Sequence, residues 1–268
     1  MLSHSCGPTD WLSLREAKKD SRKGDNGRVL ILAGSKQYHG SLVLAISAAV
    51  RFCDLVYVYC DKENQAVVKK LKLETPNIII LTTSSALSSF LPRIDAVLAG
   101  PGWEENAKNR RMLAHLLKTK KPLVLDATAL HIIDKRSLHK NVLLTPHGGE
   151  FKKLFGVGAT SSSVRAMAKK YKCNILCKGP LDLISNGESI CSNRVHHVGM
   201  TKGGSGDVLA GLCGALMADH NQPFEAACAA AYLNGFAGVR LSKKMGAHYS
   251  SQDLADELPL AARNIEKR

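Results

Sequence analysis

The chain has 268 residues, 45% of them hydrophobic, and a formal net charge of +14. This length and apolar content suffice to bury the core of one large α/β domain, which excludes a disordered chain. No apolar run reaches the roughly 18 to 20 residues of a membrane helix, and the first ten residues lack the basic start and apolar stretch of a secretory signal, so we expect a cytoplasmic location and no membrane partner.

The basic residues occur in small groups beside expected helices, at 18–23, 118–121 and 169–172. A nucleic-acid platform would combine a basic tract with aromatic residues, which are only 5% here. We therefore do not expect nucleic acid as a partner. A basic surface also attracts anionic small molecules such as nucleotides, and a solvated basic exterior with no specific partner stays open as an alternative.

The eight cysteines include no Cys-X-X-Cys pair, and most lie in apolar stretches. Buried free thiols are therefore the preferred interpretation. Cys173 and Cys177 could be combined with His196 and His197, but these positions match no zinc-ligand spacing. We predict no structural metal from the cysteine pattern.

Apolar strands alternate with helical segments over the first 150 residues. The expected strands span 28–33, 55–59, 78–81, 95–99, 122–126 and 141–144, and the expected helices span 41–52, 61–72 and 104–117. This alternation predicts right-handed crossovers and a parallel sheet covered on both faces. Ligands of such sheets bind outside the carboxyl ends of the strands, where four of these segments end in glycine or polar residues.

The pattern changes near residue 174. Strands are expected at 174–177, 181–185 and 188–192, and the pair Asn186-Gly187 indicates a hairpin, which predicts an antiparallel edge on the sheet. The remainder is expected to be helical, at 206–219, 223–242 and 251–263. No linker or repeat divides the chain, so we expect a single domain over 1–268, with residues 1–22 as an N-terminal extension.

A glycine-rich turn leads into the helix expected to begin at Gly206. The backbone of this turn could form an anion hole, made by Gly203, Gly204, Ser205 and Gly206. Glycines let the main chain approach a ligand closely, and the free amides and dipole of a helix N-terminus attract a phosphate. Asp207 follows at once and could act as a base beside that anion. Equally, it could be a carboxylate that only stabilises the helix start.

Three common nucleotide and hydrolase motifs are missing from the sequence. There is no Gly-X-X-X-X-Gly-Lys-Ser/Thr loop, no Gly-X-Gly-X-X-Gly after the first strand, and no Gly-X-Ser-X-Gly elbow. A phosphate-handling site therefore depends on the turn at 203–207.

Four ordered motifs occur along the chain: Gly100-Pro101-Gly102, 144–151, Lys178-Gly179 and 202–211. In this order and spacing the chain resembles the ADP/ATP-dependent NAD(P)H-hydrate dehydratase family, a branch of the ribokinase-like superfamily. The resemblance extends from about residue 23 to 259. It implies a ribokinase-like three-layer αβα sandwich, with a mainly parallel central sheet and an antiparallel edge. The epimerase domain that is fused to some family members is absent from this sequence.

The resemblance also implies an activity, the repair of a damaged nicotinamide cofactor. (S)-NADHX or (S)-NADPHX, hydrated at C6, would be dehydrated to NADH or NADPH while ADP or ATP is converted to AMP or ADP and phosphate. Asp207 would take the proton of the C6 hydroxyl, which then attacks the terminal phosphoryl group. Mg²⁺ is expected with the nucleotide, although the sequence identifies no ligands for it.

Other site residues are carried over from the family's motifs. Ala45, Gly102 and His147 would bind the hydrated nicotinamide nucleotide together with Asp207. The adenine nucleotide would be bound by Lys178, Gly179, Pro180, Leu181, Asp182 and Gly206. Two ordinary interpretations stay open: His147 as a turn histidine held by backbone hydrogen bonds, and Lys178 as a solvated lysine at a strand end.

Four positions differ from the residues usual in the family. Gly148 replaces the usual proline, Ser205 the usual threonine, and Trp103 the usual leucine. Thr128 replaces an aspartate that is frequent in the motif beginning at Asp126, so Asp126 is the only carboxylate of that motif. None of these differences removes a proposed catalytic group.

Two other functions stay open. A small-molecule kinase of the same superfamily would keep Asp207 and the anion hole, and a basic nucleic-acid-associated protein would have lost the activity. The resemblance further implies a homo-oligomer, since family members often form tetramers, and a separate NAD(P)HX epimerase as functional partner.

Overall fold

The structure is a computed structural model that describes residues 3–267. Its strands form a single sheet in the order β1-β10-β9-β8-β7-β6-β5-β2-β3-β4. The strands are β1 (Ser3–Ser5), β2 (Arg28–Leu32), β3 (Leu55–Val58), β4 (Ile78–Ile80), β5 (Ala96–Ala99), β6 (Leu123–Leu125), β7 (Val142–Leu144), β8 (Asn174–Cys177), β9 (Asp182–Ser185) and β10 (Ile190–Asn193). All pairings from β4 across to β8 are parallel, as the alternating sequence pattern predicts.

Helices cover both faces of this sheet. They are α1 (Pro8–Leu12), α2 (His39–Ala49), α3 (Lys62–Glu74), α4 (Ser84–Phe90), α5 (Ala107–Lys118), α6 (Thr128–Ile132), α7 (Gly148–Phe155), α8 (Ser161–Tyr171), α9 (Ser205–Ala218), α10 (Pro223–Met245) and α11 (Ser251–Glu266). Short 3-10 helices occupy Leu91–Arg93, Lys135–Ser137 and Val198–Thr201. Within residues 3–267, no helix combines the length and the apolar character that a membrane crossing requires.

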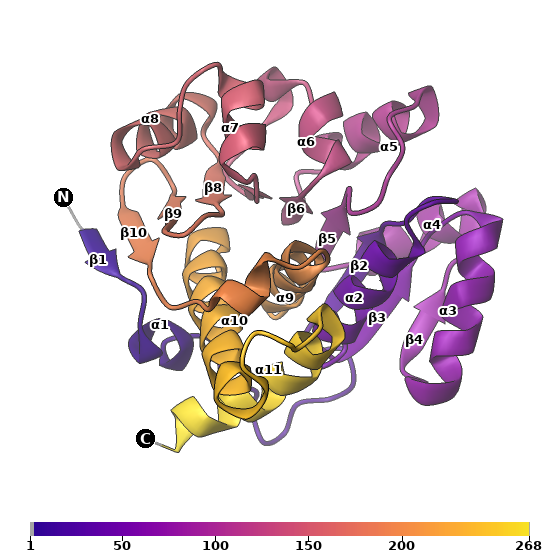
Figure 1. The fold of residues 1–268 in the computed structure, drawn as a ribbon. Helices are drawn as coiled ribbons and strands as arrows, with labels where there is room; N and C mark the ends of the chain where they lie inside the picture. The colour runs from indigo at the N-terminus through magenta and orange to yellow at the C-terminus, as the bar shows by residue number, and fades with distance from the viewer. Residues whose placement is uncertain (1–2, 268) are drawn as a thin grey trace.

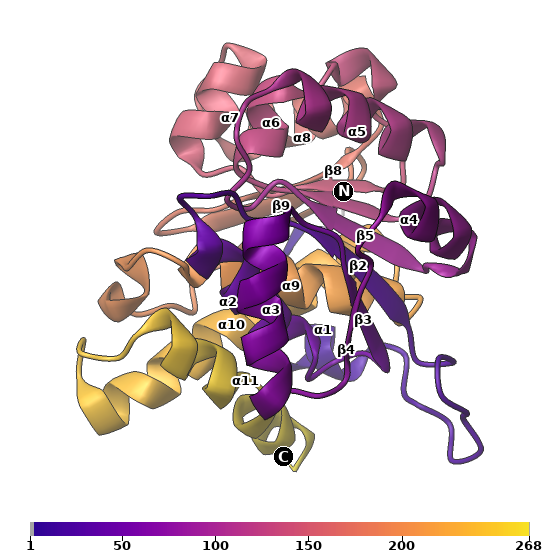
Figure 2. The ribbon, with the colours of Figure 1, turned by 90° about the vertical axis from the view of Figure 1, so that its right-hand side faces the viewer.

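The core consists of two apolar layers, one on each face of the sheet. In β2, Val29 and Ile31 pack into one layer while Leu30 and Leu32 pack into the other. Helices α2, α9, α10 and α11 cover the first face, and α5 to α8 cover the second (Figures 1 and 2). Because both faces are covered, the strands are apolar without alternation. The expected three-layer αβα fold is confirmed.

Strand β9 pairs antiparallel with both β8 and β10, so the expected antiparallel edge is confirmed. The predicted hairpin turn lies between β9 and β10. Asn186 Oδ1 accepts hydrogen bonds from the backbone amides of Glu188 and Ser189, and Gly187 adopts a φ of 93°. A side chain at this φ would be strained, which explains the Asn-Gly pair.

The N-terminal segment belongs to the sheet rather than extending from it. Strand β1 pairs in parallel with β10, and α1 packs against α10 and α11. The polar sequence of residues 3–12 gives no signal of these elements, because its partners supply the apolar contacts. Residues 1, 2 and 268 of the expected single domain lie outside the described residues. Helices α4, α6, α7 and α8 are also additions to the sequence-based expectation.

Candidate functional site

The glycine-rich turn forms the start of α9, as its sequence predicts. Gly204 is the residue before the helix and has a φ of 97°, and an added Cβ there would lie 2.3 Å from Leu44 Cδ1. The turn is fixed from α11, since Ser251 Oγ donates a hydrogen bond to the carbonyl of Gly203 at 2.8 Å. The first amides of a helix have no acceptor within that helix, so this turn presents donors suited to an anion.

A buried ion pair lies against this helix start. Lys178 Nζ donates to Asp126 Oδ1 at 2.7 Å, and Thr145 Oγ1 donates to the same oxygen at 2.8 Å. A Cβ on Gly206 would lie 3.2 Å from Lys178 Nζ, so glycine gives the ammonium room beside the helix. Burial disfavours the charged ammonium, but the Asp126 carboxylate outweighs that effect and the pKa of Lys178 is raised. The interpretation of Lys178 as a solvated strand-end lysine is therefore wrong.

Asp207 lies in the first turn of α9, within the field of this ion pair. Burial and the nearby Asp126 carboxylate raise its pKa to about 6, while a hydrogen bond with Ser41 and the charge of Lys178 act in the opposite direction. A carboxylate with this pKa is ionised at neutral pH and still accepts a proton readily, which suits a general base.

His147 connects the 144–151 motif with the Lys178 motif. Its backbone forms a parallel bridge with Lys178, and Lys178 N donates to the Pro146 carbonyl at 2.7 Å. Its ring Nδ1 accepts from the amides of Gly149 and Glu150 and so caps α7. Nε2 must then carry the proton of the neutral ring, which makes it a donor. The histidine held by backbone bonds is thus confirmed, and the same residue also borders the cavity described next.

A cavity of about 500 Å³ opens beside the start of α9. Among the residues predicted to bind ligands, it is lined by His147, Lys178, Gly179, Pro180, Asp182, Ser205 and Gly206. Asp182 shapes this wall, because its Oδ1 accepts from Gly179 N at 3.0 Å and its Oδ2 from Asn193 Nδ2 at 3.0 Å. The size and the mixed apolar and polar lining suit a nucleotide.

The remaining predicted residues lie outside the lining of this cavity. Leu181 packs against one of the two apolar layers, and Gly203 and Gly204 are not among the residues that line the cavity. Ala45 is fully buried in α2, where its carbonyl would lie 2.3 Å from a Cβ on Gly211. Close packing of α2 on α9 therefore accounts for Ala45 without a ligand.

Gly102 lies against the start of α2, next to Ser41. It has a φ of 64°, and an added Cβ would lie 2.7 Å from the carbonyl of Tyr38 and 3.1 Å from Ser41 Cβ. Since Ser41 also interacts with Asp207, the Gly100–Gly102 loop, the start of α2 and the start of α9 meet at this carboxylate. Tyr38 is 54% exposed beside them. Asp207 itself is not among the residues that line the cavity, but its chain neighbour Gly206 is.

Several contributing residues were not among the predicted ligand-binding set. Asp126 pairs with Lys178, and Thr145 donates a hydrogen bond to Asp126. Ser41 hydrogen-bonds Asp207, and Asn193 donates to Asp182. Asp126 could have been found, because it is a carboxylate at the end of a parallel strand. Ser41 and Asn193 depend on contacts between distant segments, for which the sequence has no local signal.

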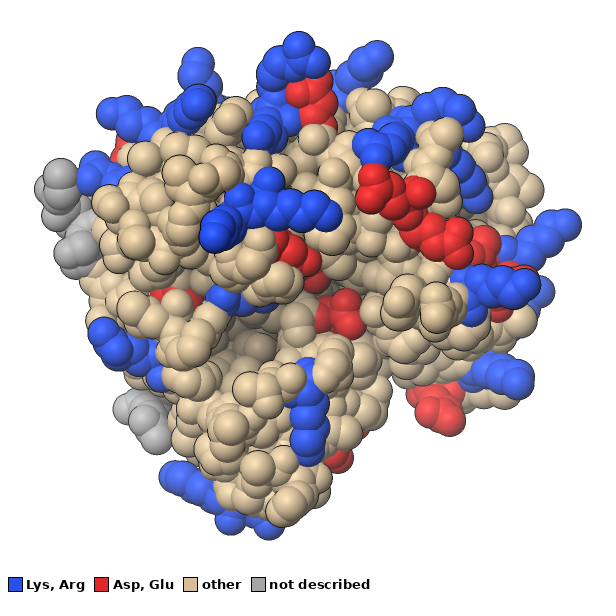
Figure 3. All heavy atoms as spheres, turned by 45° about the horizontal axis from the view of Figure 1, so that its top comes forward, with Lys and Arg blue, Asp and Glu red and all other residues tan. Residues whose placement is uncertain are grey.

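The charged surface fits a small anionic ligand better than an extended polyanion. On the face shown in Figure 3, Lys and Arg side chains are scattered over the surface, and both basic and acidic residues adjoin a central hollow. This distribution forms no continuous basic track on that face.

The fold defines a ribokinase-like α/β protein, with a cavity at the N-terminus of α9. The model of the NAD(P)H-hydrate dehydratase family matches residues 29–260. A Nitrosopumilus maritimus protein named ADP-dependent (S)-NAD(P)H-hydrate dehydratase is 38% identical over 273 residues, covering 93% of each chain. The chain belongs to the NAD(P)H-hydrate dehydratase family.

Two solved structures share its fold. A ribokinase-like superfamily protein from Enterococcus faecalis superposes with a TM-score of 0.89 at 22% identity, covering 98% of this chain and 96% of that one. The ADP/ATP-dependent NAD(P)H-hydrate dehydratase from Bacillus subtilis, co-crystallised with ATP and Mg²⁺, superposes with a TM-score of 0.84 at 24% identity, covering 97% and 98%. These likenesses establish the ribokinase-like architecture.

Proposed function

We propose that this protein is a nucleotide-dependent dehydratase that restores NADH or NADPH from the C6-hydrated (S) form. The observation that carries the proposal is Asp207, a buried carboxylate with a pKa of about 6 that lies next in the chain to Gly206, which lines a nucleotide-sized cavity. Family membership supports the substrate class. The name of the Nitrosopumilus relative favours ADP as the phosphoryl donor.

The first step is a phosphoryl transfer to the C6 hydroxyl. Asp207 takes the hydroxyl proton, and the oxygen attacks the terminal phosphorus as the bond to the leaving phosphate oxygen breaks. With ADP the leaving group is AMP, and with ATP it is ADP. Protein groups contribute mainly orientation and charge to such transfers. Amides from residues 203–206 would face the transferred group, and the Lys178 ammonium would balance its charge.

The second step is elimination. Phosphate departs from C6 with the electrons of the C–O bond, and a proton leaves C5, which restores the ring double bond of the reduced nicotinamide. Phosphorylation makes the oxygen a far better leaving group than hydroxide. One hydrated cofactor and one ADP therefore give one reduced cofactor, one AMP and one phosphate.

Nucleotide and substrate would meet close to Asp207. We assign the nucleotide to the cavity, where Lys178, Gly179, Pro180, Asp182 and Gly206 form part of the lining. The family motifs also place Leu181 in this group. The hydrated nicotinamide would approach Asp207 along Gly102 and the start of α2, and the same motifs assign His147 and Ala45 to it. His147 borders the cavity, so it would contact the substrate where the two ligands meet, whereas the fully buried Ala45 would act only through the packing of α2.

Mg²⁺ fits this site as an ion brought by the nucleotide rather than one held by a protein cage. Among the described residues, no group of three or more carboxylate, histidine or cysteine ligands surrounds Asp207. Asp126 Oδ1 is already occupied by Lys178 and Thr145. Magnesium commonly keeps several waters and binds through substrate phosphates, whose charge it neutralises.

Two partner assignments accompany the proposal. We propose that the protein is a homo-oligomer. Its molar mass, measured by light scattering during size-exclusion chromatography, tests this, and the mass of a monomer would contradict it. We also propose that a separate epimerase converts the (R) hydrate into the substrate. A mixture of the (R) and (S) epimers should then be consumed only in part by this chain, and full consumption would contradict that dependence.

The activity is tested by incubating the protein with hydrated NADH, Mg²⁺ and either ADP or ATP. Return of the NADH absorbance together with free phosphate supports the dehydratase. A stable phosphorylated product without NADH would instead show a small-molecule kinase. DNA binding that weakens with salt, without nucleotide turnover, would show a nucleic-acid-associated protein.

A further inference from the structure

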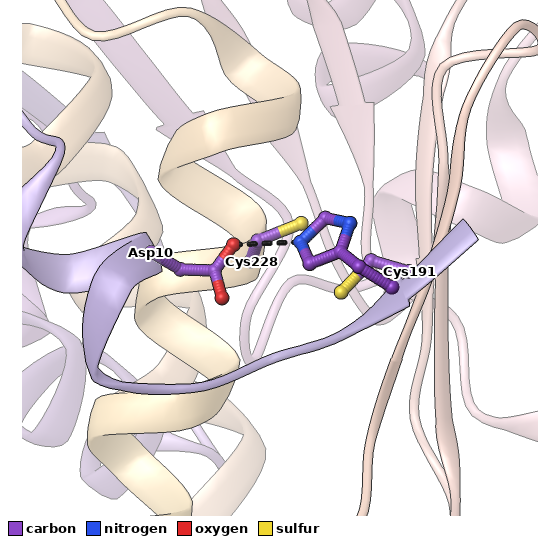
Figure 4. A group of neighbouring side chains, drawn as sticks. Asp10, Cys191 and Cys228 are labelled. Carbon is purple, nitrogen blue, oxygen red and sulfur yellow. Dashed lines mark hydrogen bonds and ion pairs between the residues drawn. The ribbon is translucent and has the colours of Figure 1, made fainter. Parts of the chain in front are cut away.

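A cluster of sulfur, imidazole and carboxylate groups lies where the N-terminal segment meets the sheet. One ligand atom from each of His4, Asp10, Cys191 and Cys228 lies within 4.8 Å of the other three. These residues come from β1, α1, β10 and α10, so segments far apart in sequence converge here. Figure 4 shows Asp10, Cys191 and Cys228 directed toward one another from three separate elements.

The burial of the cluster is graded from its thiols to its imidazole. Cys191 and Cys228 are each 1% exposed, whereas the His4 side chain is 44% exposed and that of Asp10 13%. His4 Nε2 and Asp10 Oδ1 are 2.8 Å apart. The two thiols are thus shielded from solvent, whereas the histidine is exposed, so an ion can reach the cluster from the side of His4.

The donor set and its spacing match one kind of ligand. We propose that Cys191, Cys228, His4 and Asp10 bind one Zn²⁺ ion, which fastens the N-terminal segment to β10 and α10. Thiolate, imidazole and carboxylate are the donors of four-coordinate zinc sites. In a tetrahedral zinc site with bonds of about 2.0 to 2.3 Å, the donor atoms lie roughly 3.3 to 3.8 Å apart. Here the donor atoms lie within 4.8 Å of one another, and His4 Nε2 and Asp10 Oδ1 are 2.8 Å apart, so small side-chain shifts would bring all four onto one ion.

A third thiol, that of Cys6, adjoins the proposed site. Cys6 is 8% exposed and its sulfur lies 2.7 Å from that of Cys191. Two thiolates bound to the same zinc would lie farther apart, roughly 3.7 Å. We therefore place Cys6 beside the metal and outside its four ligands.

The zinc site would stabilise a wall of the large cavity. Cys191 lies two residues before Asn193, and Cys228 lies one helical turn before Ala231, and both later residues line the cavity. Asn193 Nδ2 donates to the Ala231 carbonyl at 3.0 Å, which joins the two elements. None of the four ligands belongs to the proposed reaction site, so the ion takes no part in that chemistry.

The test begins with the intact protein kept reduced with a phosphine and supplied with ZnCl₂. After removal of free metal, non-denaturing mass spectrometry should find one Zn²⁺ per chain. His4→Ala removes an exposed ligand without disturbing the core, and it should weaken zinc binding at least tenfold. His115→Ala, an exposed histidine on α5, is the matched control and should leave binding unchanged.

The cysteine ligands are tested with Co²⁺ in place of zinc. We expect thiolate-to-cobalt charge-transfer absorption whose intensity corresponds to two thiolates. Cys191→Ser and Cys228→Ser should each lower it, whereas Cys6→Ala and Cys173→Ala should retain it. Chelator should lower the melting temperature of the wild-type protein but not that of His4→Ala.

Three results would overturn the proposal. These are failure of the reduced wild-type protein to retain zinc, equal zinc content in His4→Ala and its control, and a metal-free protein with a Cys6–Cys191 disulfide. None of these readouts requires dehydratase activity, so they are independent of the proposed function.

Discussion

Replacement of Asp207 by asparagine separates the chemistry of the site from its architecture. The amide keeps the size of the side chain but cannot take a proton. General-base catalysis contributes about 10²- to 10⁴-fold, so we expect turnover to fall by at least about 10²-fold. Nucleotide affinity should change little, because Lys178 and the amides of 203–206 remain.

The same substitution should stabilise the folded protein at neutral pH. An ordinary Asp pKa of 3.8 raised to about 6 means that ionising Asp207 costs the folded state about 3 kcal/mol, at about 1.4 kcal/mol per pKa unit. Below pH 3.8 the carboxyl is protonated in both the folded and unfolded states, so wild type and variant should be equally stable. The advantage of Asp207→Asn should grow as pH rises and reach its full value above about pH 6.

Both effects are measurable on one pair of proteins. Turnover is followed through NADH absorbance, nucleotide binding by calorimetry, and the free energy of unfolding by urea titration at several pH values. For wild type, kcat/KM should fall about tenfold per pH unit below about pH 6, as the base becomes protonated. Near-wild-type turnover in Asp207→Asn would refute the assigned base. A stability difference that does not change with pH would refute the buried-carboxylate explanation.

Further substitutions, with their controls, test the surrounding groups. Lys178→Met should weaken nucleotide binding and cost about 3–5 kcal/mol by leaving Asp126 charged and unpaired. Adding Asp126→Asn should restore stability in urea titrations but not binding, and recovery of binding would contradict the assigned role of Lys178. His147→Ala should lose the α7 cap and lower the free energy of unfolding by about 0.5–2 kcal/mol, whereas His147→Asn should keep the cap. Equal losses of activity in both variants would show that the imidazole ring itself contacts the substrate. Gly206→Ala should displace the Lys178 ammonium and raise the KM for nucleotide, while Gly203→Ala, where an added carbon meets no atom within 4 Å, should not.

Sequence periodicity predicts the central part of the fold well and its margins poorly. The parallel strands are continuous apolar runs because both faces are buried, and glycine or polar residues mark their ends. Strand β1 and helix α1 are polar and short, and they exist through pairing with β10 and contacts with α10 and α11. Such long-range contacts leave no periodic signal in residues 3–12.

The candidate site was predictable where its residues share a local motif. Gly204, Gly206 and Asp207 lie within one turn, and Lys178 begins a second recognisable motif. The partner of Lys178 was harder to assign, because Asp126 is 52 residues away and only the parallel sheet brings the two strand ends together. The proposed zinc ligands lie at 4, 10, 191 and 228, so no spacing rule for zinc could have found them.

The central claim is that this chain dehydrates a hydrated nicotinamide cofactor by transient phosphorylation. The most direct measurement is the product stoichiometry with purified (S)-hydrated NADH, ADP and Mg²⁺, followed by NADH absorbance and by chromatography of the nucleotides. We predict one NADH, one AMP and one phosphate for each hydrated cofactor consumed, with no lasting phosphorylated cofactor. Loss of ADP without return of NADH, or accumulation of a stable phosphorylated product, would contradict the claim.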